Sequence, residues 1–448
     1  ESQTDISAYL HDTYDNSDSG YRYPYYFDAV IDEAVNEYGL DEEDVMNKGY
    51  KIYTALDQDY QKQLEATYQN NALFPANASD GAMVQSASVA LDPNTGGVQA
   101  LVGRRGDHVF RGFSFATQMR RSPGSTIKPL SVYTPALEAG YKPSSVLKDE
   151  PQSYYDAHNF DGTYQGEVPM YQAVAQSLNL PAVWLLHEIG LQKGYDKAEE
   201  FGLPLAKSDK YYGLALGGLE KGVSPMIMAG AYSAFANEGQ MYTPHLITKI
   251  VDSTGAVIID NTNKKPKQVI SKETADEMTS MLLGTFSNGT AAAANPAGYT
   301  IAGKTGTTET NFDATKANDQ WMIGYTPDVV ISTWMGFEES SKLHYLEGTS
   351  GNVVGKVFKS AAEGILPYTS KTGFSVADAY ATGGQVVAAD QVGNTGNSNG
   401  ESGNWQDNLN QYGEQAKEGL KNFGDMVKEG VQGIGEAAKD LWRKYQGE

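Results

Sequence analysis

The sequence predicts a mixed α/β (α+β) fold in which strands from distant parts of the chain form one sheet around a helical insertion. Two alternating apolar runs flank the turn Asp92–Gly97, which is typical of a β-hairpin. Strand-like runs return at 299–305, 320–326 and 328–337, and the periods over 125–240 are mostly helical. Because strands lie at both ends of this region, we expect its sheet to be closed by sequence-distant pieces.

A smaller module precedes this region. Apolar residues recur at helical spacing over 26–39 and again over 58–69, and residues 50–57 alternate as in a strand. We therefore assign residues 1–80 to an interdomain linker module of short helices and a strand. The main domain is assigned to residues 81–368.

The helical insertion of the main domain predicts four helices, at residues 126–140, 170–178, 181–190 and 224–239. A second hairpin around Ser253–Gly255 and a helix at 271–286 follow before the chain returns to strands. This order is strands, then helices, then strands.

The composition changes at the end of the chain. Past residue 369 it is rich in Gly, Asn and Ser, which predicts a linker, and residues 405–445 have the apolar spacing of an amphipathic helix. Six glycines interrupt that pattern, and each costs about 1 kcal/mol relative to alanine in a helix. We assign residues 369–448 to a linker and an amphipathic tail, with a frayed tail favoured over docking to the domain, a partner or a membrane surface.

Charge and cysteine content exclude several functions. The chain of 448 residues has 56 acidic and 34 basic residues, a net charge of −22 and no cysteine. We therefore expect no nucleic-acid partner, no disulfide and no thiolate metal site. Neither a targeting signal nor an apolar run of 18 residues is present, and the chain begins at Glu1, so we interpret it as a fragment of a longer protein.

The stretch "RRSPGSTIKP" has the features of a nucleophile site. Ser125 and Lys128 are three residues apart, so on a helix that begins near Ser125 the amine can reach the hydroxyl. Pro123 and Gly124 interrupt regular structure just before, which places Ser125 at a helix N-terminus. An N-capping serine with a surface lysine is the simpler alternative, and Ser145 with Lys148 repeats the spacing in a loop.

Two further motifs follow. Ser177 and Asn179 lie in a predicted bend between helices, where they can point into a cleft or cap local backbone. In "IAGKTGTT", Lys304 leads a strand end on which Thr305 and Thr307 share a face, and Gly306 leaves room for a ligand backbone. A sheet-edge lysine is the alternative.

These three motifs, Ser-x-x-Lys, Ser-x-Asn and Lys-Thr-Gly, occur in the order known from penicillin-binding proteins and class A β-lactamases. With "QSLNLPAV", "ALGGLEKGVSP" and "NDQWMIGYTPD", residues 84–366 resemble the transpeptidase domain of a class A penicillin-binding protein. Residues 21–72 resemble the segment that joins the glycosyltransferase domain of that family to its transpeptidase domain. That glycosyltransferase domain and its transmembrane anchor are not in this sequence. A second Lys-Thr-Gly, at Lys371–Gly373, follows a proline and precedes Phe374, so we interpret it as coincidental.

The resemblance implies a serine DD-peptidase or β-lactamase-like fold, an antiparallel sheet flanked by helices with a helical lobe. It implies Ser125 as the nucleophile, Lys128 as the base, Ser177 as a proton relay beside Lys304, and Asn179 binding the substrate amide or positioning Lys128. It also implies an oxyanion site from the backbone N–H groups of Ser125 and Thr307, and a carboxylate site at Thr305 and Thr307. Gly306 belongs to the substrate-binding set.

The implied function is a peptidoglycan DD-transpeptidase that forms a serine acyl-enzyme with stem peptides ending in D-Ala-D-Ala and is inhibited covalently by β-lactam antibiotics. A DD-carboxypeptidase and a β-lactam-sensing domain are the alternatives. The E-x-x-L-N segment that activates water in class A β-lactamases is missing between Asn179 and Lys304, so we predict slow deacylation. We expect no cofactor. We also expect no metal, because "HEIGL", which begins at His187, has Leu191 where a zinc motif needs its second histidine. The resemblance places the full-length protein at the extracellular face of the bacterial cytoplasmic membrane, membrane-anchored and in a cell-wall synthesis complex.

Overall fold

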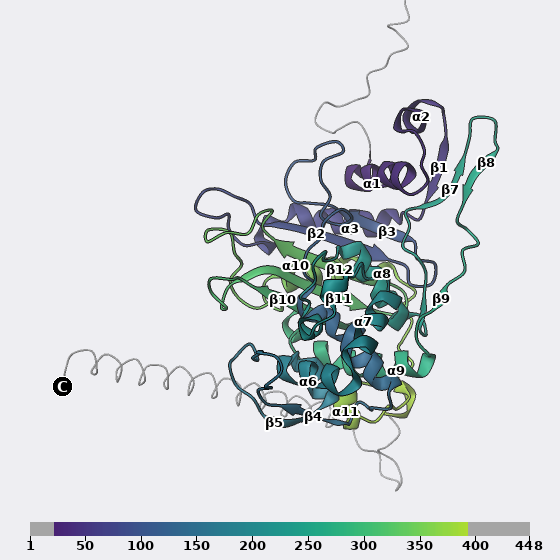
Figure 1. Ribbon diagram of the computed structural model, residues 1–448. Coiled ribbons are helices and arrows are strands. Elements are labelled where there is room, and N and C mark those ends of the chain that lie inside the picture. Colours follow the sequence, from purple (N-terminus) through teal and green to yellow (C-terminus); the bar gives the residue numbers. More distant parts are fainter. Residues whose placement is uncertain (1–21, 393–448) are drawn as a thin grey trace, which may run out of the picture. The chain divides into compact units, whose positions relative to one another are not determined.

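Five strands from the two ends of the main domain form one antiparallel sheet in the computed structural model, which describes residues 22–392 (Figure 1). They are β2 (Gln85–Leu91), β3 (Val98–Val102), β10 (Ala302–Glu309), β11 (Ala317–Tyr325) and β12 (Val330–Gly336). Their order is β10-β11-β12-β2-β3, and Ser332 of β12 pairs with Val89 of β2. The predicted closure of the sheet by sequence-distant pieces is therefore confirmed.

Both faces of this sheet are buried, so its central strands are apolar on both sides. Successive residues point to opposite faces: Val89 and Trp334 belong to one hydrophobic cluster, and Ala90 and Met335 belong to the other. The helix α8 (Pro225–Ala236) covers the first face, and α3 (Gln58–Gln69) and α10 (Val354–Ile365) cover the second. This arrangement fixes the strand register, because a shift by one residue would exchange the two faces.

The helical insertion forms a lobe that lies below the sheet in Figure 1. Its elements are α4 (Thr134–Glu138), α5 (Met170–Gln176), α6 (Asn179–Ile189), α7 (Leu191–Glu200), α9 (Lys272–Ser287) and the strand pair β4 (Val146–Asp149) and β5 (Gly166–Pro169). The helix α9 packs against both α5 and β10 and so connects the lobe to the edge of the sheet. The expected antiparallel sheet with flanking helices and a helical lobe is confirmed.

The N-terminal elements α1 (Pro24–Asn36), α2 (Glu42–Asn47) and β1 (Lys51–Thr54) pack on the main domain. The strand β1 pairs with β7 (Ile247–Val251), which forms the predicted second hairpin with β8 (Val257–Asp260). From α1, Tyr26 donates a hydrogen bond to Val98 O at 2.6 Å, and the Glu33 carboxylate accepts from the backbone N–H groups of Leu246 and Ile247. The module therefore shares a core with the main domain, and the boundary near residue 80 remains a prediction.

The segment after residue 369 differs from the linker that its composition predicts. Val376 and Ala379 are buried, Phe374 packs on Tyr325, and Ser280 of α9 donates a hydrogen bond to Ala377 O. A short helix, α11 (Ala379–Thr382), lies in this packed segment. The predicted amphipathic tail at 405–445 lies outside the described residues.

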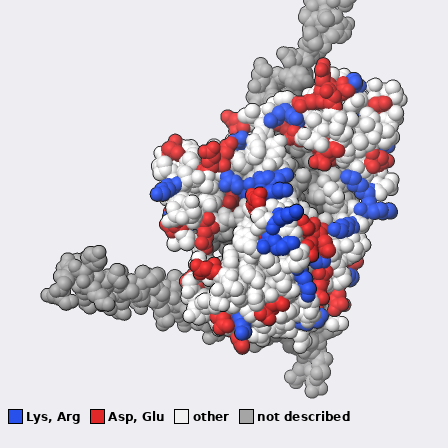
Figure 2. Space-filling view, in the orientation of Figure 1, with Lys and Arg blue, Asp and Glu red and all other residues white. Residues whose placement is uncertain are grey.

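Two short strands, β6 (Gln240–Met241) and β9 (Lys267–Gln268), complete the structure between residues 22 and 392. No helix in this part of the chain is long and apolar enough to cross a membrane. Acidic and basic side chains alternate over the face shown in Figure 2.

Candidate active site

Ser125 lies in the first turn of an irregular helical segment. A 3₁₀ turn at Gly124–Ile127 leads through Lys128 into a π-helical turn at Pro129–Tyr133 and then into α4. The sequence predicts a helix that begins here, but a regular α-helix does not form. Pro129 has no N–H, so Ser125 O accepts its hydrogen bond from the Lys128 N–H in a 3₁₀ arrangement.

The turn that carries Ser125 is packed tightly on both sides. Gly124 has a positive φ of 52°, and a Cβ there would lie 2.6 Å from Thr307 O of β10. A Cβ on Gly306 would lie 2.6 Å from Pro123 O, and a Cβ on Gly217 would lie 2.5 Å from the Gly124 nitrogen. The space at Gly306, which we expected a ligand backbone to use, is therefore filled by the turn itself.

Buried hydrogen bonds fix this turn from the sheet and from α8. The Trp321 indole of β11 donates to Ser122 O at 2.9 Å, and the Tyr232 hydroxyl of α8 donates to Thr126 O at 2.7 Å. These bonds hold the backbone on both sides of Ser125, whose side chain remains partly exposed. The arrangement presents one hydroxyl on a rigid support.

Lys128 is fully buried behind Ser125. Its Nζ donates to three oxygen atoms where α5 ends and α6 begins: Ser177 O at 2.7 Å, Leu178 O at 2.9 Å and Asn179 Oδ1 at 2.7 Å. Within residues 22–392 no hydrogen bond joins this amine to the Ser125 hydroxyl, in contrast to the contact expected from their spacing. These three acceptors match the three N–H donors of an ammonium group. The ammonium group must therefore lose one proton, and with it one of these hydrogen bonds, before the amine can accept another proton.

Lys304 meets the same segment from β10. Its buried Nζ donates to Ser177 Oγ at 2.6 Å and to Thr305 O at 3.1 Å. Ser177 lies between α5 and α6, as predicted, with a left-handed φ of 57° that is strained for a residue other than glycine. One residue therefore contacts both lysines, Lys128 through its carbonyl and Lys304 through its hydroxyl.

Burial changes the proton affinity of both lysines. It lowers the pKa of Lys304 to about 7. Burial, and then the charge of Lys304, lower the pKa of Lys128 well below its ordinary value. Burial therefore favours the neutral form of both amines, which a lysine needs in order to act as a general base.

Thr305 and Thr307 of β10 have partners that the sequence does not reveal. The Thr305 hydroxyl lies 2.6 Å from Thr290 Oγ1, and the Thr307 hydroxyl lies 2.6 Å from Ser350 Oγ. Ser350 also donates to Gly306 O at 2.7 Å. Ser350 and Asn352 have the Ser-x-Asn spacing, but Ser402 and Asn404 have it too, so the spacing does not distinguish Ser350. No local sequence pattern connects Thr290 or Ser350 with this site.

The other copies of these motifs lie elsewhere. Lys148 is exposed at the end of β4 and forms an ion pair with Glu150, and the Ser145 hydroxyl accepts from the Lys142 N–H. Lys371 is exposed in the segment after α10. His187 lies on α6, where its ring stacks on Tyr154 at 4.0 Å.

Comparison with known proteins identifies relatives of this arrangement. The family model described as "Penicillin binding protein transpeptidase domain" matches residues 86–363. Penicillin-binding protein 2a of Streptococcus pneumoniae is 50% identical over 393 residues, which are 86% of this chain and 53% of that protein. Penicillin-binding protein 1F of Bacillus subtilis is 39% identical over 353 residues, 78% of this chain and 47% of that protein. The chain thus spans about half the length of these relatives.

Solved structures show the same fold. PonA1 from Mycobacterium tuberculosis in complex with penicillin V aligns with a TM-score of 0.67 and 26% identity, covering 80% of this chain and 96% of that chain. Penicillin-binding protein 1A from Haemophilus influenzae aligns with a TM-score of 0.64 and 20% identity over 80% of this chain and 72% of that chain, a likeness of fold alone.

Proposed function

The chain belongs to the penicillin-binding protein transpeptidase family, and from this premise we propose that it is a D-Ala-D-Ala transpeptidase that cross-links peptidoglycan stem peptides. The family implies serine acyl transfer on peptidoglycan. The observation that carries the proposal is the convergence on Ser177 of two buried lysines with lowered pKa values, directly behind the turn of Ser125. These contacts support the assignment of Lys128 as the base, Ser125 as the nucleophile and Ser177 as the proton relay.

In the acylation step, the neutral Lys128 amine takes the proton of Ser125, and Oγ attacks the carbonyl carbon between the two D-alanines. The backbone N–H groups of Ser125 and Thr307 hold the oxyanion; in support, the Thr307 backbone lies directly against Gly124. When the C–N bond breaks, the Ser177 hydroxyl passes its proton to the leaving amine and regains one from the Lys304 ammonium, which donates to Ser177 Oγ. Thr305 and Thr307 receive the terminal carboxylate.

In the second step, an amine of another stem peptide attacks the carbonyl carbon of the Ser125 ester and gives a proton to neutral Lys304 through Ser177. The ester C–O bond then breaks, the cross-link forms, and the Lys128 ammonium returns its proton to Ser125 Oγ. A β-lactam follows the first step only. Its ring-opened acyl group remains attached, because the segment that activates water in class A β-lactamases is missing. We further propose that the full-length protein is anchored to the membrane, faces the cell wall and acts within a cell-wall synthesis complex.

The reaction is tested with a stem-peptide ester as donor and a D-amino acid as amine acceptor. Transpeptidation predicts an aminolysis product whose yield rises with acceptor concentration, and its loss in Ser125→Ala. Hydrolysis product alone at all acceptor concentrations would identify a DD-carboxypeptidase instead. Stable acylation by penicillin without turnover of the ester would favour a β-lactam-sensing domain.

A further inference from the structure

Asn159 lies outside the three motifs but is bonded directly to the segment that holds Lys128. Its side chain is only 3% exposed. Its Oδ1 accepts from the backbone N–H groups of Asn179 at 2.8 Å and Leu180 at 3.2 Å. These N–H groups open α6 and have no partner within the helix, so a residue 20 positions upstream caps it.

A buried carboxylate fixes the orientation of Asn159. Its Nδ2 donates to Asp149 Oδ1 at 2.7 Å and to Thr163 O at 2.9 Å. Asp149 is fully buried at the end of β4, and its second oxygen accepts from the Gln165 N–H at 2.8 Å. Both donors and the acceptor oxygen of Asn159 are therefore engaged, and a flipped amide would place two like groups together at each end.

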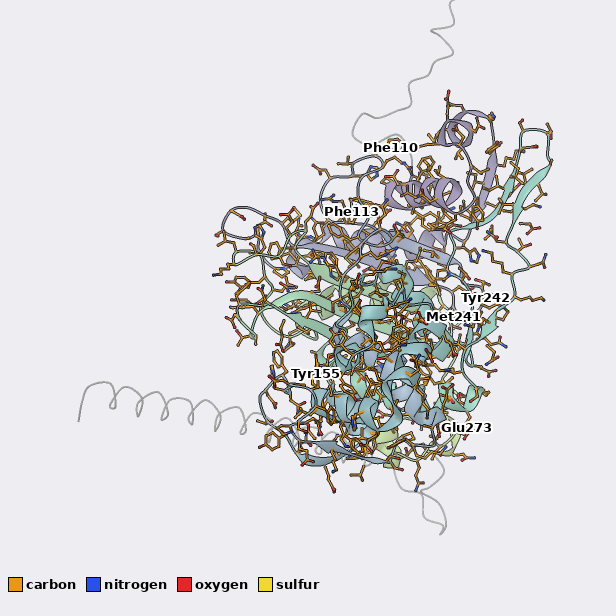
Figure 3. The ribbon with its side chains drawn as sticks, viewed as in Figure 1. Phe110, Phe113, Tyr155, Met241, Tyr242 and Glu273 are labelled. Atoms are coloured by element: carbon orange, nitrogen blue, oxygen red, sulfur yellow. The ribbon has the colours of Figure 1, made fainter. Side chains whose placement is uncertain are left out.

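The neighbouring residue sets the orientation of the Asn179 side chain. His158 O accepts from Asn179 Nδ2 at 2.8 Å, which turns Asn179 Oδ1 toward the Lys128 amine. The loop that carries these residues is held on α6, where Tyr154 stacks on His187. Tyr155, the next residue of the loop, is labelled in Figure 3, and its ring contacts the rings of Tyr211 and Tyr212.

We propose that Asn159, oriented by Asp149, is a positioning residue that keeps the Asn179 amide and the adjoining carbonyl groups in contact with the Lys128 amine. This inference rests on the proposed function, in which Lys128 removes the Ser125 proton. The charged group that faces Lys128 from the sheet is Lys304 of β10. From the lobe side, the charge of Asp149 acts on the π-helical turn that follows Lys128, because burial and then this charge raise the pKa of Tyr133 in that turn.

Asn159→Ala tests this role through the kinetics of acylation by a fluorescent penicillin. We expect the second-order rate constant to fall at least 10-fold while the fraction of protein that is finally labelled stays near that of the wild type. The Lys128 ammonium also loses a well-placed acceptor, so the acidic limb of the pH–rate profile should move to lower pH. A purely structural role would lower the labelled fraction and leave the rate constant and the profile unchanged, which would overturn the proposal.

Gln165→Ala is the matched control on the same loop. Its exposed side chain donates to Gln176, and its backbone N–H still serves Asp149, so the wild-type rate constant is expected. A loss of rate in this control equal to that in Asn159→Ala would also contradict the specific role of Asn159.

A double variant that exchanges the side chains of Asn159 and Asp149 tests the proposal even if Asn159→Ala does not fold. Asn159→Asp keeps the acceptor for α6 but opposes two carboxylates, so acylation should slow at least 10-fold. Adding Asp149→Asn restores a donor between the two side chains, and the rate should return to within about 3-fold of the wild type. No recovery in the double variant would overturn the proposal. Failure of the wild type itself to be acylated would instead refute the proposed function.

Discussion

The buried lysines should cost the protein stability, and Lys304→Met measures that cost. A lysine whose pKa falls from 10.5 to about 7 on folding binds its proton less tightly in the native state than in the unfolded chain. The unfolded state therefore holds more protons between these pH values, so stability must rise as the pH rises from about 7 toward 10.5. Below pH 7 the full cost is present.

The size of the effect follows from the shift. About 3.5 pH units at 1.36 kcal/mol each give about 5 kcal/mol, of which about 4 kcal/mol applies at pH 7 and about 1.4 kcal/mol at pH 9.5. Methionine removes this cost but also the two hydrogen bonds of the amine, to Ser177 Oγ and Thr305 O, which are worth about 1 kcal/mol each. Lys304→Met should thus be about 2 kcal/mol more stable than the wild type at pH 7 and about 0.6 kcal/mol less stable at pH 9.5.

Urea denaturation followed by tryptophan fluorescence at several pH values between 7 and 9.5 provides the measurement. Lys148→Met is the matched control, because Lys148 is exposed and its variant should differ from the wild type by less than about 0.5 kcal/mol. The absence of a stability difference between Lys304→Met and the wild type at pH 7 would refute the argument that the lowered pKa of Lys304 destabilises the native state. A difference that does not shrink as the pH rises would refute it as well.

Three further predictions concern the reaction. Because Lys128 must be neutral and burial lowers its pKa, the acylation rate should fall as the pH is lowered, with the fall beginning well below the ordinary lysine value of 10.5; a rate that begins to fall already near pH 10.5 would contradict a buried lysine base. Gly306→Ala forces a methyl group against Pro123 O and should slow acylation at least 10-fold, whereas Gly373→Ala, with open space around its Cβ, should not. The penicillin adduct should survive gel filtration unchanged by mass; complete loss of the adduct in that time would show an unexpected deacylation route.

Order and context in the sequence distinguish the three motifs that the structure brings close together from their copies. Lys304 follows an apolar strand and precedes Thr307, whereas Lys371 follows a proline and precedes an aromatic residue. The strands at both ends of the domain predict a closed sheet, and the structure pairs β2 with β12. These are local sequence patterns, and the strand arrangement that they predict is present in the folded structure.

Features that depend on tertiary contacts could not be predicted in this way. The irregular helix after Ser125 follows from Pro129, which the sequence shows, but the contacts of Lys128 depend on a loop 50 residues away. Gly306 looks like open space in the sequence because nothing local reveals that the turn of Ser125 fills it. Asn159 sits in a Gly- and Asp-containing stretch typical of a turn, and its bond to Asn179 appears only in the folded chain.

The central claim is that Ser125 is the nucleophile. It is tested by the intact mass of the protein after incubation with penicillin, followed by peptide mapping of the adduct. The wild type and Ser145→Ala should each gain the mass of one penicillin, located on Ser125, and Ser125→Ala should gain none. An adduct that persists in Ser125→Ala, or a wild-type protein that remains unmodified, would contradict the account.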